Sequence, residues 1–389
     1  MAANFLARET VEQILKDTVP ILGDEAKRTI ITFSTLNATW AELSRPYLLN
    51  DFALKGEEDA LAYLGLISSP HSTFPSPTRC ERFALESSVM SEAGISALRD
   101  VVESVLPPNY LHLHAIDGGI PNAILQVFTS WTNLQHLSIS GGVHAPSMFF
   151  DQLTQFASLR SLRLHDFRFE SATEDTRYTF PPGLTDLSLS RSSSVWIFLQ
   201  SHVIPSGGFD GIRELRIQAR FSFLVGGVWE MAECLAALQN VETLELEPIY
   251  TDCPNLRRNM ESIFLPLNMP LLRIQGLKKL CLKFAQVPSE FVFNVLIMST
   301  IHLPSINTDM AIDISLPQSS ALWDNTDPAF LLRQLLAETN PVNTPNLEPE
   351  SSITVRRFPG ALPQDIGDTK IARVCGYPVA FVDTKSTPA

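Results

Sequence analysis

The chain has 389 residues, a formal net charge of −13 at pH 7, 45% hydrophobic residues and 18% charged residues. This hydrophobic content can build a sizeable core, so extensive disorder is not expected. A nucleic-acid surface needs a concentrated basic patch, whereas the basic residues here occur singly or in isolated pairs. The composition therefore argues against a nucleic-acid partner. It favours two or three ordinary domains or one elongated array.

Residues 1–56 predict a small helical module. Thr10 and Gln13 form a capping box that opens a helix, and Pro20 ends it. Apolar residues at helical spacing lie between them, at Val11, Ile14, Leu15 and Val19. A second helical stretch is predicted from Asp24.

A third predicted helix carries Leu36, Trp40 and Leu43 on one face and ends at Pro46. Residues 50–55 alternate between apolar and polar types, as in a short strand. Residues 57–77, which contain several prolines among serines and threonines, are interpreted as a connecting segment.

The middle of the chain repeats the pattern L-x-x-L-x-L, with Ile or Val replacing some leucines. Six copies begin at Leu134, Leu159, Leu184, Ile212, Val241 and Leu277, which gives spacings of 25, 25, 28, 29 and 36 residues. Weaker copies flank them, at residues 83–85, 111–113, 312–314 and 353–355. Alternation within each copy predicts a strand with one buried face.

Parallel neighbouring strands need a crossover after each strand. Three crossovers carry apolar residues at helical spacing: Phe149, Leu153 and Phe156; Trp196, Leu199 and Val203; and Met231, Leu235 and Leu238. Residues 166–182 are predicted to be irregular because they combine Ser, Thr and Asp with two adjacent prolines.

This pattern resembles the leucine-rich-repeat family over roughly residues 78–358. The resemblance implies an α/β solenoid, a curved parallel sheet with helical or irregular crossovers, in which each repeat buries its apolar edge against its neighbours. The family's turn asparagine is replaced in all six copies, by Gly142, Phe167, Ser192, Arg220, Ile249 and Ala285. We therefore expect no ladder of asparagine side chains and less regular turns.

The segment from Leu36 to Leu54 resembles the second half of an F-box, with residues 9–19 as that family's first helix. Ala7-Arg8 stands where the family has Leu-Pro, and the link from the first helix to Trp40 is longer than usual. The resemblance implies a small all-α module that docks a Skp-type adaptor. The residues it assigns to this contact are Val11, Ile14, Leu15, Leu36, Trp40, Leu43 and Pro46. The alternative is that Trp40, Val11, Ile14 and Leu15 are core residues of the helical module.

An F-box-like module followed by irregular leucine-rich repeats resembles the divergent F-box proteins of fungi. This combination implies the substrate-recognition subunit of a Skp–cullin–F-box-type ubiquitin ligase, which would hold its target protein with the repeats. The alternative is a leucine-rich-repeat scaffold without a ubiquitin-ligase role, whose N-terminal helices cap the stack.

The residues that alternate with the buried leucines should point out of the predicted sheet, onto the concave surface. We call this the strand face and expect the partner protein to bind there. The predicted contact residues are His136, Ser138, Arg163, His165, Asp186, Ser188, Glu214, Arg216, Thr243, Glu245 and Lys279. The alternative is that these residues are merely solvated and that the partner binds loops or the C-terminal segment.

No metal, cofactor or catalytic site is expected. His112 and His114 share a strand face, but same-face neighbours lie about 7 Å apart, too far to chelate a metal without further ligands. The sequence contains no phosphate-binding loop, nucleophile elbow or zinc-protease motif. We therefore expect a binding protein rather than an enzyme.

Five scattered cysteines without a Cys-x-x-Cys pair suit a reducing compartment. Residues 1–10 lack the apolar core of a secretory signal, and the apolar stretch at residues 291–303 is too short to span a membrane. A cytoplasmic or nuclear location without a membrane partner is expected. The predicted organisation is an F-box-like module (1–56), a connecting segment (57–77), a solenoid (78–358) and a C-terminal cap and tail (359–389).

Overall fold

The structure is a computed structural model that divides into two compact units, Met1–Arg160 and Ser161–Ala389. Each unit is considered by itself. The structure describes residues 8–18, 32, 38–48, 51–70, 78–87, 90–115, 122–170, 176–220, 239–249, 276–283, 311–316, 353–357, 371–374 and 377–383.

Unit 1 begins with a pair of helices, α1 (Arg8–Thr18) and α3 (Ala38–Leu48). Helix α1 starts before the predicted cap at Thr10. Helix α3 continues past Pro46, where the sequence predicts its end. A proline in the last turn removes only one backbone hydrogen bond, so the helix can extend a few residues beyond it.

The sheet of unit 1 is parallel and has the strand order β1 (Asp51–Leu54), β3 (Arg82–Ser87), β5 (Tyr110–Ala115), β6 (His136–Ser140). Leu54, Leu85, Leu113 and Ile139 follow one another in register and are all buried. The array therefore begins at Asp51, ahead of the region in which the sequence predicts repeats.

Helix α4 (Glu57–Ser68) occupies the predicted connecting segment and packs against α5 (Glu92–Ser104). The Tyr63 hydroxyl of α4 donates a hydrogen bond to Thr78 Oγ1 at 2.7 Å. The Ser91 side chain caps α5 by accepting a hydrogen bond from the Gly94 amide at 3.0 Å, which satisfies one of the free amides at a helix start. Residues 57–68 thus form part of the folded unit.

The remaining elements of unit 1 are short. They are β2 (Thr78–Arg79), β4 (Val105–Leu106), α6 (Asn122–Val127), η1 (Phe128–Ser130), β7 (Val143–His144) and α7 (Pro146–Leu153). Between the sheet and its helices, the rings of Phe83, Phe128 and Trp131 pack with centroids 5.0–5.6 Å apart. Large buried rings of this kind contribute much of a core's free energy.

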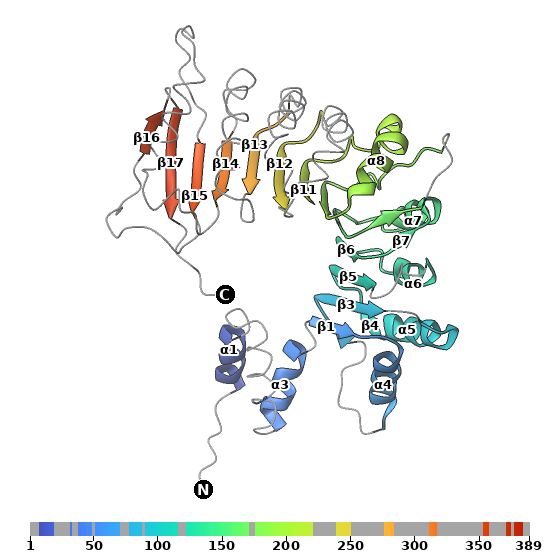
Figure 1. Ribbon diagram of the computed structural model, residues 1–389. Helices are drawn as coiled ribbons and strands as arrows, with labels where there is room; N and C mark the ends of the chain where they lie inside the picture. Colours follow the sequence, from blue (N-terminus) through green and yellow to red (C-terminus); the bar gives the residue numbers. More distant parts are fainter. Residues whose placement is uncertain are drawn as a thin grey trace, which may run out of the picture. The chain divides into compact units, whose positions relative to one another are not determined.

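Unit 2 continues the repeat pattern in a sheet of order β8 (Ser161–His165), β10 (Asp186–Ser190), β11 (Glu214–Arg220), β12 (Thr243–Ile249), β13 (Lys279–Lys283), β14 (Ala311–Leu316), β15 (Ile353–Arg357), β17 (Tyr377–Asp383), β16 (Ile371–Val374). All neighbouring pairs are parallel except β16 with β17. Figure 1 shows the strands from β11 onward side by side.

The central leucines of the repeats stack in register in this unit. Leu162, Leu187, Leu215, Leu244, Leu280 and Ile312 follow one another across the sheet. Leu162, Leu187, Leu215 and Leu244 are at most 1% exposed. The predicted long parallel sheet, with its register set by the leucines, is confirmed.

Helical crossovers occur at two of the three predicted positions, α7 and α8 (Ser193–His202). Of the core residues predicted for these two crossovers, Phe149, Leu153, Phe156, Leu199 and Val203 are fully buried. The side chain of Trp196 lies outside the described residues. The third, at residues 231–238, lies outside the described residues. The irregular crossover at 166–182 contains only the short β9 (Arg168–Phe169) among its described residues, and η2 (Ile204–Ser206) follows α8.

Residues 359–389, predicted as a cap and tail, contribute β16 and β17 to the sheet. None of the helices among the described residues is both long and apolar enough for a membrane span.

His144 lies in the core of unit 1 and is 3% exposed. Its ring packs near that of Phe149, with centroids 6.0 Å apart. Burial disfavours the charged imidazolium and lowers the pKa of His144 from 6.5 to about 4. Between pH 6.5 and pH 4, His144 is therefore protonated in the unfolded chain but largely neutral in the folded chain. The free energy of unfolding falls as the pH drops through this range.

We predict that a His144→Leu variant loses this pH dependence. Between pH 7 and pH 5 the wild type should lose about 2 kcal/mol more of its free energy of unfolding than the variant does. Urea denaturation at both pH values measures the difference, with His114→Gln as a control at an exposed histidine. Equal losses in the wild type and His144→Leu would show that His144 is protonated in the folded chain.

Candidate functional site

The predicted strand-face residues of unit 2 form three rows across the sheet, because the parallel strands are in register. The first row contains Ser161, Asp186, Glu214, Thr243 and Lys279; the middle row contains Arg163, Ser188, Arg216, Glu245 and Cys281; the end row contains His165, Ser190, Gln218 and Glu247. The sheet thus brings together the predicted contact residues of β8 to β13.

Alternation along each strand separates these rows from the core. On β10, Leu187 and Leu189 are each 1% exposed, whereas Asp186, Ser188 and Ser190 between them are half-buried. The rows are not uniformly accessible, however. The side chains of Ser161 in the first row and Cys281 in the middle row are buried. In the middle row, Arg163 and Arg216 are exposed, and Ser188 and Glu245 are half-buried.

In unit 1, Ser138 differs from its predicted role. It is 7% exposed, and its hydroxyl shares a hydrogen bond with His112 Nδ1 at 3.0 Å. The His112 and His114 rings stack with centroids 6.3 Å apart. His136 is half-buried and is the more accessible of the two predicted contact residues in this unit. Among the described residues, no three His, Cys, Asp or Glu side chains are grouped so that they could hold a metal ion.

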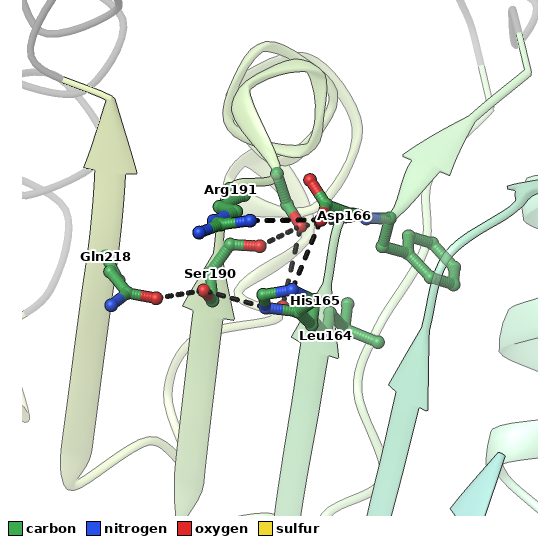
Figure 2. Close-up of polar contacts among 8 residues, drawn as sticks. Leu164, His165, Asp166, Ser190, Arg191 and Gln218 are labelled. Carbon is green, nitrogen blue, oxygen red and sulfur yellow. Dashed lines mark hydrogen bonds and ion pairs between the residues drawn. The ribbon is translucent and has the colours of Figure 1, made fainter. Parts of the chain in front are cut away.

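A polar cluster lies where β8, β10 and β11 end (Figure 2). We call its members, His165, Asp166, Ser190, Arg191 and Gln218, the strand-end cluster. His165 lies between two partners: its Nε2 is 3.2 Å from Asp166 Oδ2, and its Nδ1 is 2.9 Å from Ser190 Oγ. Ser190 Oγ also contacts Gln218 Oε1. Arg191 lies farther out, 4.0 Å from Asp166 Oδ2.

Two residues of this cluster have left-handed backbone conformations. Asp166 has φ 47° and Arg191 has φ 53°, values that side chains other than glycine adopt only at a cost. The Asp166 amide donates to the Ser190 carbonyl at 2.9 Å, and the Arg191 amide donates to the Gln218 carbonyl at 2.8 Å. In unit 1, Gly141 holds the corresponding turn position with φ 80°.

Sequence reasoning missed this turn, although the signal was present. The residue after the last strand position recurs at the 25-residue spacing of the first three copies, as Gly141, Asp166 and Arg191. Glycine and aspartate are two of the residue types that most readily adopt a left-handed conformation.

Ser192 partly replaces the missing asparagine of the repeat turn. The Phe167 amide of the preceding repeat donates to Ser192 Oγ at 3.0 Å, and that hydroxyl donates to the Ser190 carbonyl at 2.8 Å. Ser192 is 4% exposed, so these bonds satisfy buried backbone groups. At this repeat a serine side chain therefore bonds the turn in place of the family's asparagine.

Ser190, His165 and Asp166 are the residue types of a catalytic triad, and the His165 ring is within hydrogen-bonding distance of both Ser190 and Asp166. Acyl transfer also requires amide donors that stabilise an oxyanion. The adjacent Asp166 and Arg191 amides are already bonded to strand carbonyls. These two amides are therefore not available to stabilise an oxyanion.

The residues assigned to the adaptor contact largely pack against one another. Val11, Leu15, Trp40 and Leu43 form a buried cluster between α1 and α3, and Ile14 packs at its edge, partly buried. The side chains of Leu36 and Pro46 lie outside the described residues. The cluster holds the helix pair together and leaves Ile14 as the accessible apolar member of the described set.

Comparison with known proteins gives little. No family model matches the chain, and no curated protein matches it. Among solved structures, the chain is similar to the crystal structure of an internalin C2 from Listeria monocytogenes str. 4b F2365, at 15% identity and a TM-score of 0.23, over 61% of this chain and 84% of that one.

Proposed function

We propose that the chain is a leucine-rich-repeat protein that binds another protein through the strand face of unit 2. The observation that carries the proposal is the register of the three rows, since it fixes polar side chains on a rigid sheet at defined intervals. Rows of this kind suit recognition of an extended segment or loop, because within a row each strand offers one contact position to the partner.

The charges of the middle row indicate the chemistry of that partner. Arg163 and Arg216 lie two strands apart, with Ser188 between them, and Glu245 follows on the next strand. Neighbouring strands are about 4.8 Å apart. A partner that presents an acidic side chain near the arginines and a basic one near Glu245 would be held in one register.

The helix pair α1 and α3 suggests a more specific role, that of the substrate-recognition subunit of a Skp–cullin–F-box-type ubiquitin ligase. Its support is the F-box resemblance of residues 36–54 together with a folded helix pair whose buried cluster leaves Ile14 at its edge. In this role the pair would dock a Skp-type adaptor and the strand face would hold the target protein. Without adaptor binding, the chain would act as a scaffold.

We predict that replacing Arg163, Arg216 and Glu245 together by alanine reduces affinity for the partner at least about tenfold. A tenfold loss corresponds to about 1.4 kcal/mol, which one close charge pair across an interface can supply. Quantitative affinity purification from the native cell extract identifies the partner, and titration of that purified partner measures the loss.

The matched control replaces Arg99, Glu103 and Arg168 by alanine, which changes the same charges at exposed positions away from the strand face. A partner that binds the strand-face variant and the control equally well would place its binding site elsewhere.

We predict that the full chain binds a purified Skp-type adaptor and that Ile14→Ser weakens this binding about tenfold or more. Trp40→Ala is the poorer test, because Trp40 is buried in the cluster and its loss would unfold the helix pair. Gln13→Ser, at an exposed neighbouring position, is the control. If calorimetry detects no binding of the wild type to the adaptor, the scaffold role remains.

A further inference from the structure

The protons of the strand-end cluster cannot be placed independently of one another. Ser190 has one hydroxyl hydrogen and two neighbours, His165 Nδ1 and Gln218. When the hydroxyl donates to Gln218 Oε1, His165 Nδ1 must carry a hydrogen to bond with Ser190 Oγ. His165 Nε2 then needs a hydrogen as well, because a bare ring nitrogen would face the Asp166 carboxylate at 3.2 Å. The arrangement in Figure 2 therefore suits the doubly protonated ring.

A neutral His165 ring requires the opposite arrangement. Its remaining hydrogen would stay on Nε2, where the Asp166 carboxylate accepts it, which leaves Nδ1 bare. The Ser190 hydroxyl then donates to Nδ1, and its oxygen accepts a hydrogen bond from the Gln218 amide nitrogen. This requires the Gln218 amide group to turn over, so that Oε1 points away from Ser190.

We propose that His165, Ser190 and Gln218 form a proton-linked relay that sets which hydrogen-bonding group Gln218 presents on the strand face. With a neutral ring Gln218 presents its carbonyl oxygen, and with a charged ring it presents its amide N–H groups. Gln218 is thus a specificity-determining residue of the face.

Several charged groups surround the relay. Asp166 contacts the ring, Arg163 lies on the same face of β8, and Arg191 lies at the end of β10. Arg216 precedes Gln218 on the same face of β11, and Glu247 faces Gln218 from β12. Asp166 stabilises the charged ring and the arginines oppose it.

The consequence for binding rests on the function proposed above. A partner that places a backbone N–H or an ammonium group over Gln218 fits the neutral state. A partner that places a carbonyl or carboxylate there fits the charged state. The relay itself exists in the free protein, so it can be tested without any partner, and its failure would leave the proposed binding function standing.

The test is a nuclear magnetic resonance titration of the full chain with labelled histidine and glutamine, assigned through His165→Gln and Gln218→Asn variants. At high pH the neutral His165 ring should carry its hydrogen on Nε2. On acidification, the side-chain amide signals of Gln218 should shift with the same midpoint as the His165 ring. Two results of the wild-type titration would overturn the proposal. One is a hydrogen on Nδ1 of the neutral His165 ring, and the other is a set of Gln218 side-chain amide signals that do not shift when the ring is protonated.

Ser190→Ala removes the hydroxyl between the two residues and should abolish the Gln218 response while His165 still titrates. Ser188→Ala, two positions earlier on the same strand and face, should preserve it. A Gln218 amide that still follows His165 in a folded Ser190→Ala variant would show that the two residues communicate through space rather than through the relay.

Discussion

The in-register stacking of leucines between neighbouring strands is the interaction on which the other features depend. Leu187 of β10 lies between Leu162 of β8 and Leu215 of β11, and all three are essentially inaccessible to solvent. A single repeat offers no such environment, because without its neighbours its strand has no core of its own. Each repeat therefore owes its burial, and most of its stability, to the repeats beside it.

The same constraint creates the strand face. Once the leucines of a strand are fixed inward, the residues between them must point outward, and the register aligns them into rows. The chemistry of this face is then set by the side chains that occupy the rows: two arginines and a glutamate in the middle row, and a hydrogen-bonded chain of His165, Ser190 and Gln218 in the end row. The backbone amides of the left-handed residues Asp166 and Arg191 donate hydrogen bonds to carbonyls of the next strand, which keeps this chain of contacts in place.

The repeat strands and their inward leucines could be predicted because L-x-x-L-x-L is local and recurs at a near-constant spacing. The helix Glu57–Ser68 could not be predicted. The prolines that indicate a connecting segment lie after the helix, and the helix itself is stabilised by packing against α5, a later element of the chain. Ser192 was missed for a similar reason: its hydroxyl matters only through the Phe167 amide of another repeat. The helix pair was predicted, and Trp40, for which the sequence leaves a core role and an adaptor contact open, lies in the buried cluster that holds the pair together.

Backbone hydrogen exchange in a Leu187→Ala variant tests the dependence of each repeat on its neighbours most directly. Truncating this buried leucine should cost roughly 2–5 kcal/mol. If the repeats are stabilised mainly by one another, amide protection should fall in β8 and β11 as well as in β10, while Ser188→Ala on the opposite face leaves it unchanged. A loss of protection confined to β10, with β8 and β11 exchanging as in the wild type, would contradict the account.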